Sequence, residues 1–207
     1  MPDLYFEKLY GRDEGKIICG VDEVGRGPLA GPVIAAALIW PAGGVPEDVK
    51  SAIRDSKQLS KKQRETLFPA LTGLCRHSIA EASVQEIDQI NILHASLLAM
   101  QRAVEGLGVK TDLALIDGNR APRLECRAMS IVKGDSKSLS IAAASIIAKV
   151  TRDRIMEKLS AEHPGYGWEK NAGYGTTQHL EALRTLGPTC WHRDSFAPVS
   201  ELKAVSK

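Results

Sequence analysis

Apolar segments of strand length that lead toward acidic residues are the feature that most constrains how this chain can fold. Three segments share this pattern: residues 16–21 before Asp22 and Glu23, residues 113–116 before Asp117, and residues 128–132 shortly before Asp135. Short apolar runs bounded by turn residues are typical of buried strands. Because ligand sites in α/β sheets gather at the carboxyl ends of strands, we expect these carboxylates to lie at one edge of a sheet.

The remaining segments alternate between strand and helix patterns. A glycine- and proline-rich turn at residues 25–32 precedes an expected strand at 33–40, and residues 77–82 suit another strand. Capping-box patterns predict helices that begin at Ser60 and Ser83, and Pro69 is expected to disturb the end of the first one. Apolar periodicity predicts further helices at about 138–162 and at 178–186. This order indicates an α/β domain with a mixed sheet.

Length and composition limit the class of protein. The 207 residues suit one domain, 1–207, in which about 163–207 forms a C-terminal extension and residues 199–207 a flexible tail. The net charge of +2 neither requires nor excludes a nucleic-acid partner. The four cysteines form no CxxC pair, which argues against structural zinc and disulfides. Without an apolar signal core or a membrane-length run, we expect a cytoplasmic monomer with no membrane association.

Carboxylates that converge repel one another and raise each other's pKa, and a divalent cation is the usual remedy. Oxygen ligands favour magnesium or manganese, and several carboxylates make two ions about 3.5–4 Å apart feasible. Neighbouring strand residues point to opposite faces, so Asp22 and Glu23 are expected to share a metal only where the strand ends or bulges. The alternative is structural: aspartates after strands often form turns, and Asp135 lies where it could cap a helix.

Six sequence blocks carry a specific resemblance. They are DEVGRGPLAGPV at 22–33, DSKQLS at 55–60, LIDGN at 115–119, KGDSKSLSIAAASIIAKVTRD at 133–153, HPGYG at 163–167 and AGYGT at 172–176. In this order, the blocks resemble those of the type 2 ribonucleases H, and of bacterial ribonuclease HII in particular. The resemblance covers about residues 17–196.

The resemblance implies a ribonuclease H-like mixed sheet flanked by helices, with a small C-terminal helical extension. It implies an endonuclease that hydrolyses the RNA strand of RNA–DNA hybrids and cuts 5′ to single ribonucleotides embedded in duplex DNA. By the same resemblance, two magnesium or manganese ions would be bound by the catalytic carboxylates Asp22, Glu23, Asp117 and Asp135. In-line hydrolysis through two metal ions would leave a 5′-phosphate and a 3′-hydroxyl.

Substrate contacts are also implied by the resemblance. Gly25, Arg26 and Gly27 match the element that reads the ribose, and Tyr174 matches a tyrosine that stacks on the sugar; Tyr166 is the competing candidate. Lys57 is expected to contact a backbone phosphate. Taken alone, residues of these types more often form an ordinary turn, a half-buried tyrosine with a satisfied hydroxyl and a solvated lysine.

Two further segments carry weaker expectations. The basic residues of the long helix are expected to contact a duplex only collectively; they are Lys137, Lys149, Arg152, Arg154 and Lys158. The sequence assigns no chemical role to HRDSF at residues 192–196, although this segment also resembles the family.

Two other functions remain open at this stage. A related metal-dependent DNA nuclease, such as a junction resolvase, would share the acidic cluster but has no need for a ribose-reading GRG. An inactive hybrid-binding domain would gain affinity by losing negative charge near phosphates, so keeping all four carboxylates argues against it.

Overall fold

The computed structural model describes residues 1–53 and 59–205, and at its centre is a five-stranded sheet in the order β3-β2-β1-β4-β5. The strands are β1 (Ile18–Val24), β2 (Val33–Ile39), β3 (Arg76–Ala82), β4 (Leu113–Asp117) and β5 (Arg127–Ile131). β1 and β3 run antiparallel to β2, whereas β1, β4 and β5 are parallel. The predicted mixed sheet is therefore confirmed.

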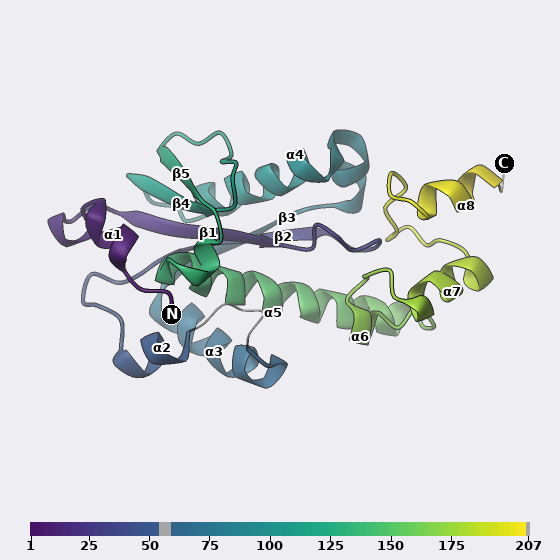
Figure 1. Ribbon diagram of the computed structural model, residues 1–207, viewed down its shortest axis with the longest axis horizontal. Coiled ribbons are helices and arrows are strands. Elements are labelled where there is room, and N and C mark those ends of the chain that lie inside the picture. The colour runs from purple at the N-terminus through teal and green to yellow at the C-terminus, as the bar shows by residue number, and fades with distance from the viewer. Residues whose placement is uncertain (54–58, 206–207) are drawn as a thin grey trace.

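Helices cover both faces of the sheet, with α4 on one side and α5 with α3 on the other (Figure 1). The helices are α1 (Tyr5–Leu9), α2 (Glu47–Ala52), α3 (Lys61–Leu74), α4 (Val84–Glu105), α5 (Leu139–Glu162), α6 (Trp168–Asn171), α7 (Thr177–Leu186) and α8 (Val199–Val205), with 3-10 turns η1 (Arg12–Glu14) and η2 (Gly134–Ser136). None of the described helices is long and apolar enough to cross a membrane.

Both predicted capping boxes are present. The Ser60 hydroxyl accepts the Gln63 N–H at the start of α3, and the Ser83 hydroxyl accepts the Glu86 N–H at the start of α4. Pro69 does not end α3, so that expectation was wrong. Pro69 removes only its own N–H from the helix, and the following turn stays in place because Leu71 is buried in the core.

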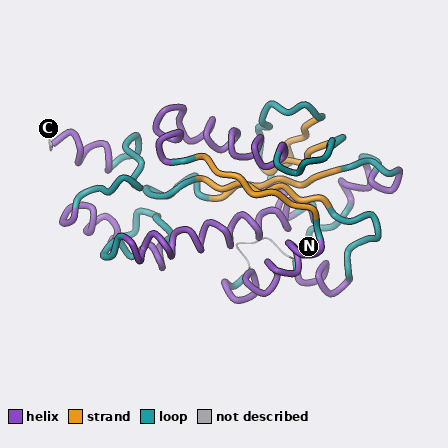
Figure 2. Tube along the Cα trace, turned by 180° about the vertical axis from the view of Figure 1, so that it is seen from behind, coloured by secondary structure: helices purple, strands orange, loops and turns teal. Residues whose placement is uncertain are grey.

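The C-terminal part packs beside the end of the sheet where β1 turns into β2, and Figure 1 shows α6, α7 and α8 there. The Cα trace seen from behind in Figure 2 shows the C-terminus at the same end of the molecule. Residues 199–205 of the expected flexible tail instead form a helix, and residues 206–207 lie outside the described residues. Helix α8 begins at Val199, whose side chain is buried against Leu29 and Leu183. A single valine gave no periodicity from which this docking could be predicted.

Helix α5 lies directly on β1 because Gly20 has no side chain. A Cβ on Gly20 would stand 2.2 Å from the carbonyl carbon of Ser140 and 2.4 Å from the backbone nitrogen of Ile141. The alanines of α5 are buried at this face together with Ala36 of β2. Small residues on both elements thus allow the backbone of α5 to approach the centre of the sheet closely.

The substitution Gly20→Ala tests this contact. We expect the free energy of unfolding, measured by urea denaturation, to fall by about 3 kcal/mol or more, since overpacking costs about 1–3 kcal/mol and backbone atoms cannot rotate away. Gly43→Ala is the matched control, because a Cβ there would meet nothing within 4 Å. A loss below about 1 kcal/mol for Gly20→Ala would show that the helix does not depend on this approach.

Candidate active site

Asp22 lies in β1 and is only 5% exposed. Its Oδ1 accepts the Glu23 N–H at 2.7 Å, and the hydroxyl of Ser145, in α5, also forms a hydrogen bond to it. Burial raises the pKa of Asp22 well above its ordinary value, and the charges of Glu23 and Asp117 raise it further. The carboxylate therefore stands at the interface of β1 and α5 with its charge incompletely compensated.

Glu23 follows Asp22 without any break in the strand. Asp22 pairs with Ala36 and Glu23 with Ala35 in regular register, so the expected strand end or bulge was wrong. The physical reason is β2, which pairs with β1 as far as Val24 although β4 leaves β1 at Val21. The two side chains accordingly leave the strand toward opposite faces. The charge of Asp117 nevertheless raises the pKa of both carboxylates, so both lie within its electrostatic reach at the end of β4.

The carboxylate of Glu23 is nearly enclosed. Its Oε1 lies 3.4 Å from Arg26 Nη1, whereas its Oε2 is buried and has no hydrogen-bond partner among the described residues. Burial raises the pKa of Glu23 to about 7; Arg26 lowers this pKa and Asp117 raises it. A buried carboxylate oxygen that no donor contacts is stabilised when it binds a proton or a cation.

Asp117 ends β4 beside the Asp22 position, because Val21 of β1 lies opposite Ile116 of β4. Its Oδ1 accepts the Gly134 N–H at 2.6 Å. Gly134 begins the turn η2, which follows β5 and carries the buried Asp135. Asp117 therefore lies at the carboxyl end of a parallel strand, as predicted. The hydrogen bond from Gly134 holds the turn η2, which contains Asp135, next to Asp117.

Asp135 is not the cap of the long helix. The N-cap of α5 is Ser138, whose side chain accepts the Ile141 N–H at 3.2 Å. The alternative reading of Asp135 as a helix cap was therefore wrong. Its burial next to a turn that is hydrogen-bonded to Asp117 leaves its carboxylate among the candidates for ion binding.

The donor set suits a hard divalent cation, since it includes the buried carboxylates of Asp22 and Glu23, whose pKa values are raised, and one Glu23 oxygen without a partner among the described residues. Across residues 1–53 and 59–205, no three acidic, histidine or cysteine side chains are grouped so that they could hold an ion as they stand. Asp22 and Asp117 instead accept backbone N–H groups.

The loop of residues 25–32, which follows Glu23 in the chain, forms the next part of the site. Gly25 has a φ of +99°, and a Cβ there would lie 2.2 Å from Arg152 Nε. A Cβ on Gly27 would lie 3.4 Å from Tyr174 Cε1. The loop of residues 25–32 therefore passes between a buried arginine and an exposed tyrosine, with glycine at both close approaches.

The structure separates the two tyrosine candidates. Tyr174 is 46% exposed beside Gly27. Tyr166 is 4% exposed, donates its hydroxyl to the Gly187 carbonyl at 2.6 Å and stacks on Trp168 with ring centroids 5.0 Å apart. Of the two candidates, Tyr174 is the one whose ring is exposed.

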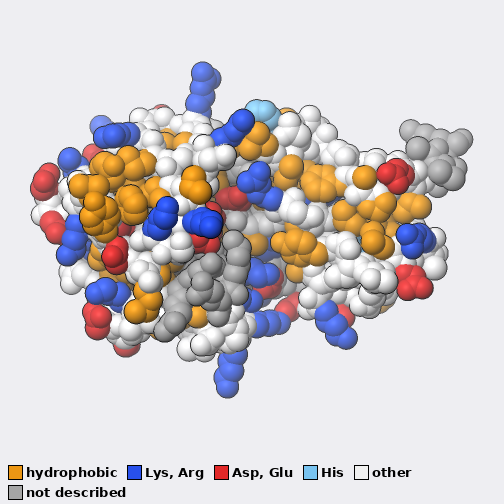
Figure 3. Space-filling view, viewed as in Figure 1, with side chains coloured by type: hydrophobic (Ala, Val, Ile, Leu, Met, Phe, Trp, Pro, Cys, Tyr) orange, Lys and Arg blue, Asp and Glu red, His pale blue; other side chains and the backbone are white. Residues whose placement is uncertain are grey.

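The basic residues of α5 do not act as one set. Arg152 is fully buried and bonds to backbone carbonyls, so its place in a duplex-binding face was wrong. Lys149 is paired with Asp153 at 2.6 Å and Arg154 with Glu65 at 2.5 Å. Lys and Arg side chains are scattered over the face shown in Figure 3. The expected phosphate contact of Lys57 lies outside the described residues.

No role for the 192–196 segment could be predicted from the sequence, and the structure shows one for Arg193. This side chain is fully buried and donates hydrogen bonds to the carbonyls of Gly25, Arg26 and Gly31. Nothing in the local sequence distinguishes a buried arginine from a solvated one, because its acceptors are backbone groups more than 160 residues away.

Comparisons with known proteins place the chain in one family. The family model described as Ribonuclease HII matches residues 19–199. Ribonuclease HII of Paramagnetospirillum magneticum is 53% identical over 201 residues, covering 97% of this chain and 98% of the relative. That of Granulibacter bethesdensis is 54% identical over 207 residues, covering 99% and 93%.

Solved structures show the same fold. Ribonuclease H2 from Pyrococcus horikoshii is 26% identical with a TM-score of 0.76, and the match covers 91% of this chain and 98% of that one. Bst-RNase HIII in complex with Mn²⁺ is 22% identical with a TM-score of 0.72, covering 93% and 70%. The predicted ribonuclease H-like architecture is confirmed.

The raised pKa values predict that the buried acids cost stability in the absence of metal. The folded protein keeps protons that the unfolded chain has released, so the free energy of unfolding in chelator should fall as pH rises from about 4.5 through 7. At pH 8, Asp22→Asn should raise it by about 1 kcal/mol or more, since one pKa unit corresponds to ~1.4 kcal/mol.

Chemical denaturation in EDTA measures this difference, with the exposed Asp13→Asn as control. A destabilised Asp22→Asn protein at pH 8, with Asp13→Asn unchanged, would contradict the assignment of an uncompensated charge.

Proposed function

Because the chain belongs to the ribonuclease HII family, it is a ribonuclease H-type endonuclease for RNA–DNA hybrids, and we propose that it also cuts 5′ to single ribonucleotides in duplex DNA. The observation that carries the finer proposal is the placement of Glu23, Gly27 and Tyr174. The acidic pair and the glycine turn lie on one short stretch, and the exposed tyrosine ring stands against that turn. The family match favours this function over a junction resolvase or an inactive binding domain.

We propose that Asp22, Glu23, Asp117 and Asp135 hold two divalent cations, Mg²⁺ or Mn²⁺. When bound, such ions lower the pKa of the attacking water and stabilise negative charge on the departing 3′ oxygen. The residues contribute buried oxygen ligands whose mutual repulsion a cation relieves. The products are a 5′-phosphate and a 3′-hydroxyl, with the 2′-hydroxyl recognised and not used for attack.

Recognition of the 2′-hydroxyl requires a close and rigid approach, since this group is what distinguishes RNA from DNA at one site. Gly25 and Gly27 bring backbone groups to the ligand without side chains in the way. Arg26 is half exposed and already paired with Glu23, so it can meet a phosphate oxygen next to the carboxylates. The ribose is thereby read at the same place where the bond is cut.

The rest of the assignment follows the same family. Tyr174 stacks on the sugar of the ribonucleotide–deoxynucleotide junction, and Lys57 contacts a backbone phosphate. The partners are RNA–DNA hybrids and duplex DNA that contains ribonucleotides. We further propose that the protein acts as a monomer whose residues 1–207 form one catalytic domain, with 163–207 as its C-terminal extension.

The carboxylate assignment predicts that Asp117→Asn lowers kcat on a long RNA–DNA hybrid by at least about 100-fold in Mg²⁺, because a metal ligand and its charge are lost together. Gel-based cleavage rates measure this, and Glu14→Gln, whose side chain is 76% exposed, is the control. Turnover within about threefold of wild type would remove Asp117 from the metal site.

The role of Tyr174 predicts a selective effect. Tyr174→Ala should lower kcat/KM on a duplex with one ribonucleotide by about tenfold or more, because aromatic stacking is worth about 1–3 kcal/mol. Long hybrids should lose less, since they present a ribose at every position of one strand. The exposed Tyr5→Ala is the matched control. Equal losses on both substrates would refute the stacking role.

A further inference from the structure

Two buried arginines brace the loop of residues 25–32 from behind, and the chemistry proposed above uses neither. We propose that Arg193, assisted by Arg152, is a positioning residue that fixes this loop in its ribose-reading shape and so sets the discrimination between ribonucleotide and deoxyribonucleotide. The proposal rests on the proposed function of residues 25–27. It gives the 192–196 segment a role that the sequence did not indicate.

Arg193 joins the two ends of the loop. Its Nη2 donates to the Gly25 carbonyl at 2.5 Å and its Nη1 to the Arg26 carbonyl at 3.0 Å. Its Nε and Nη2 both donate to the Gly31 carbonyl, at 3.1 and 2.8 Å. The planar guanidinium presents its donors in a fixed fork, so these carbonyls are held at set distances from one another. A lysine ammonium cannot reproduce that fork.

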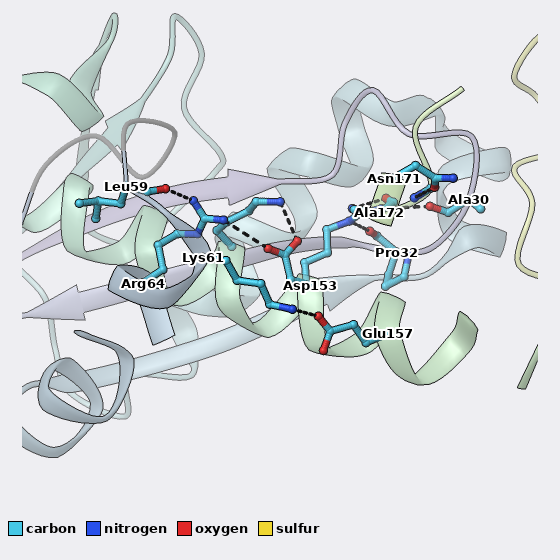
Figure 4. Close-up of polar contacts among 12 residues, drawn as sticks. Ala30, Pro32, Leu59, Lys61, Arg64, Asp153, Glu157, Asn171 and Ala172 are labelled. Atoms are coloured by element: carbon cyan, nitrogen blue, oxygen red, sulfur yellow. Dashed lines mark hydrogen bonds and ion pairs between the residues drawn. The ribbon is translucent and has the colours of Figure 1, made fainter. Parts of the chain in front are cut away.

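Arg152 joins the same loop to the segment that carries Tyr174. Its Nε donates to Pro32 at 3.0 Å, its Nη2 to Ala30 at 3.0 Å and its Nη1 to Ala172 at 2.9 Å, all through backbone carbonyls. Figure 4 shows Ala30, Pro32 and Ala172 gathered at the ends of these bonds. The side chain therefore couples the position of the tyrosine to that of the glycine turn.

Backbone hydrogen bonds complete the cross-linking. Leu29 N–H donates to Gly173 at 2.8 Å, Gly31 N–H to Trp191 at 2.9 Å, and Arg193 N–H to the Leu29 carbonyl at 2.9 Å. The glycine loop, the tyrosine turn and the 191–193 segment are thus one connected unit. Displacement of Arg193 would loosen both elements assigned to ribose recognition.

The charges of the two arginines indicate a role beyond packing. Burial and the nearby Arg152 charge lower the pKa of Arg193 to about 9, and burial lowers that of Arg152 to about 10. Two like charges buried side by side cost free energy, which the hydrogen bonds to carbonyls offset. The two arginines also give a positive electrostatic potential behind the loop of residues 25–32, which is proposed to contact a phosphodiester.

Arg193→Lys tests the proposal, with kcat/KM measured on a duplex carrying one ribonucleotide and on a long hybrid. We expect at least a tenfold loss on the single ribonucleotide and a smaller loss on the hybrid, because one ribose must meet a fixed loop whereas a hybrid offers many. The exposed Arg184→Lys is the matched control. Equal losses on the two substrates would overturn the proposal.

Hydrogen–deuterium exchange provides a readout that needs no substrate. In Arg193→Lys the Leu29 and Gly31 amides should exchange at least tenfold faster, with unchanged exchange in the strands β1 and β4. Unchanged loop exchange would refute the positioning role whatever the substrate preference. If wild-type protein cut only hybrids while the loop exchange rose as expected, the proposed single-ribonucleotide activity would fail and the bracing would stand.

A second variant tests the same proposal if Arg193→Lys does not fold. The Asp88 carboxylate accepts the N–H groups of Asp194 and Ser195, both at 2.9 Å, and so holds the segment that carries Arg193. Asp88→Asn keeps both arginines and weakens this tether. We expect the same direction of change on both readouts, and no change in either would count against the proposal.

Discussion

The close approach of helix α5 to strand β1 at Gly20 is the constraint on which the rest of the structure depends. Because the helix backbone touches the strand there, Ser145 meets Asp22 farther along the same interface. About two turns later, Arg152 reaches the loop behind the strand, and about one turn beyond it Met156 lies under Gly31. One helix thus determines the position of both the acidic site and the loop beside it.

This arrangement of buried charges lowers the free energy of unfolding, and it holds the charged groups at the proposed site of cleavage. Burial raises the pKa of Asp22 and Glu23, and one Glu23 oxygen has no partner within the described part of the chain. Arg193 is buried on the other side of the same loop and satisfied by carbonyls. Charges that cost folding free energy are retained where a cation and a phosphodiester would meet them, as expected of a functional site.

Local features could be predicted from the sequence, and long-range ones could not. The capping boxes at Ser60 and Ser83 depend on residues three apart, and the strands before Asp117 and Asp135 on short apolar runs. The continuation of β1 through Glu23 depends instead on pairing with β2, and the burial of Arg193 on carbonyls far away in the chain. Family blocks identified the candidate carboxylates, but only the fold shows their surroundings.

The central claim is that cleavage requires both a divalent cation and a ribose at the cut. Its most direct test is to map the ends produced from a duplex with one ribonucleotide, beside the same duplex made entirely of DNA. We expect a single metal-dependent cut 5′ to the ribonucleotide, with 3′-hydroxyl and 5′-phosphate ends and an intact all-DNA duplex. Cleavage of the all-DNA duplex, or a 2′,3′-cyclic phosphate end, would contradict it.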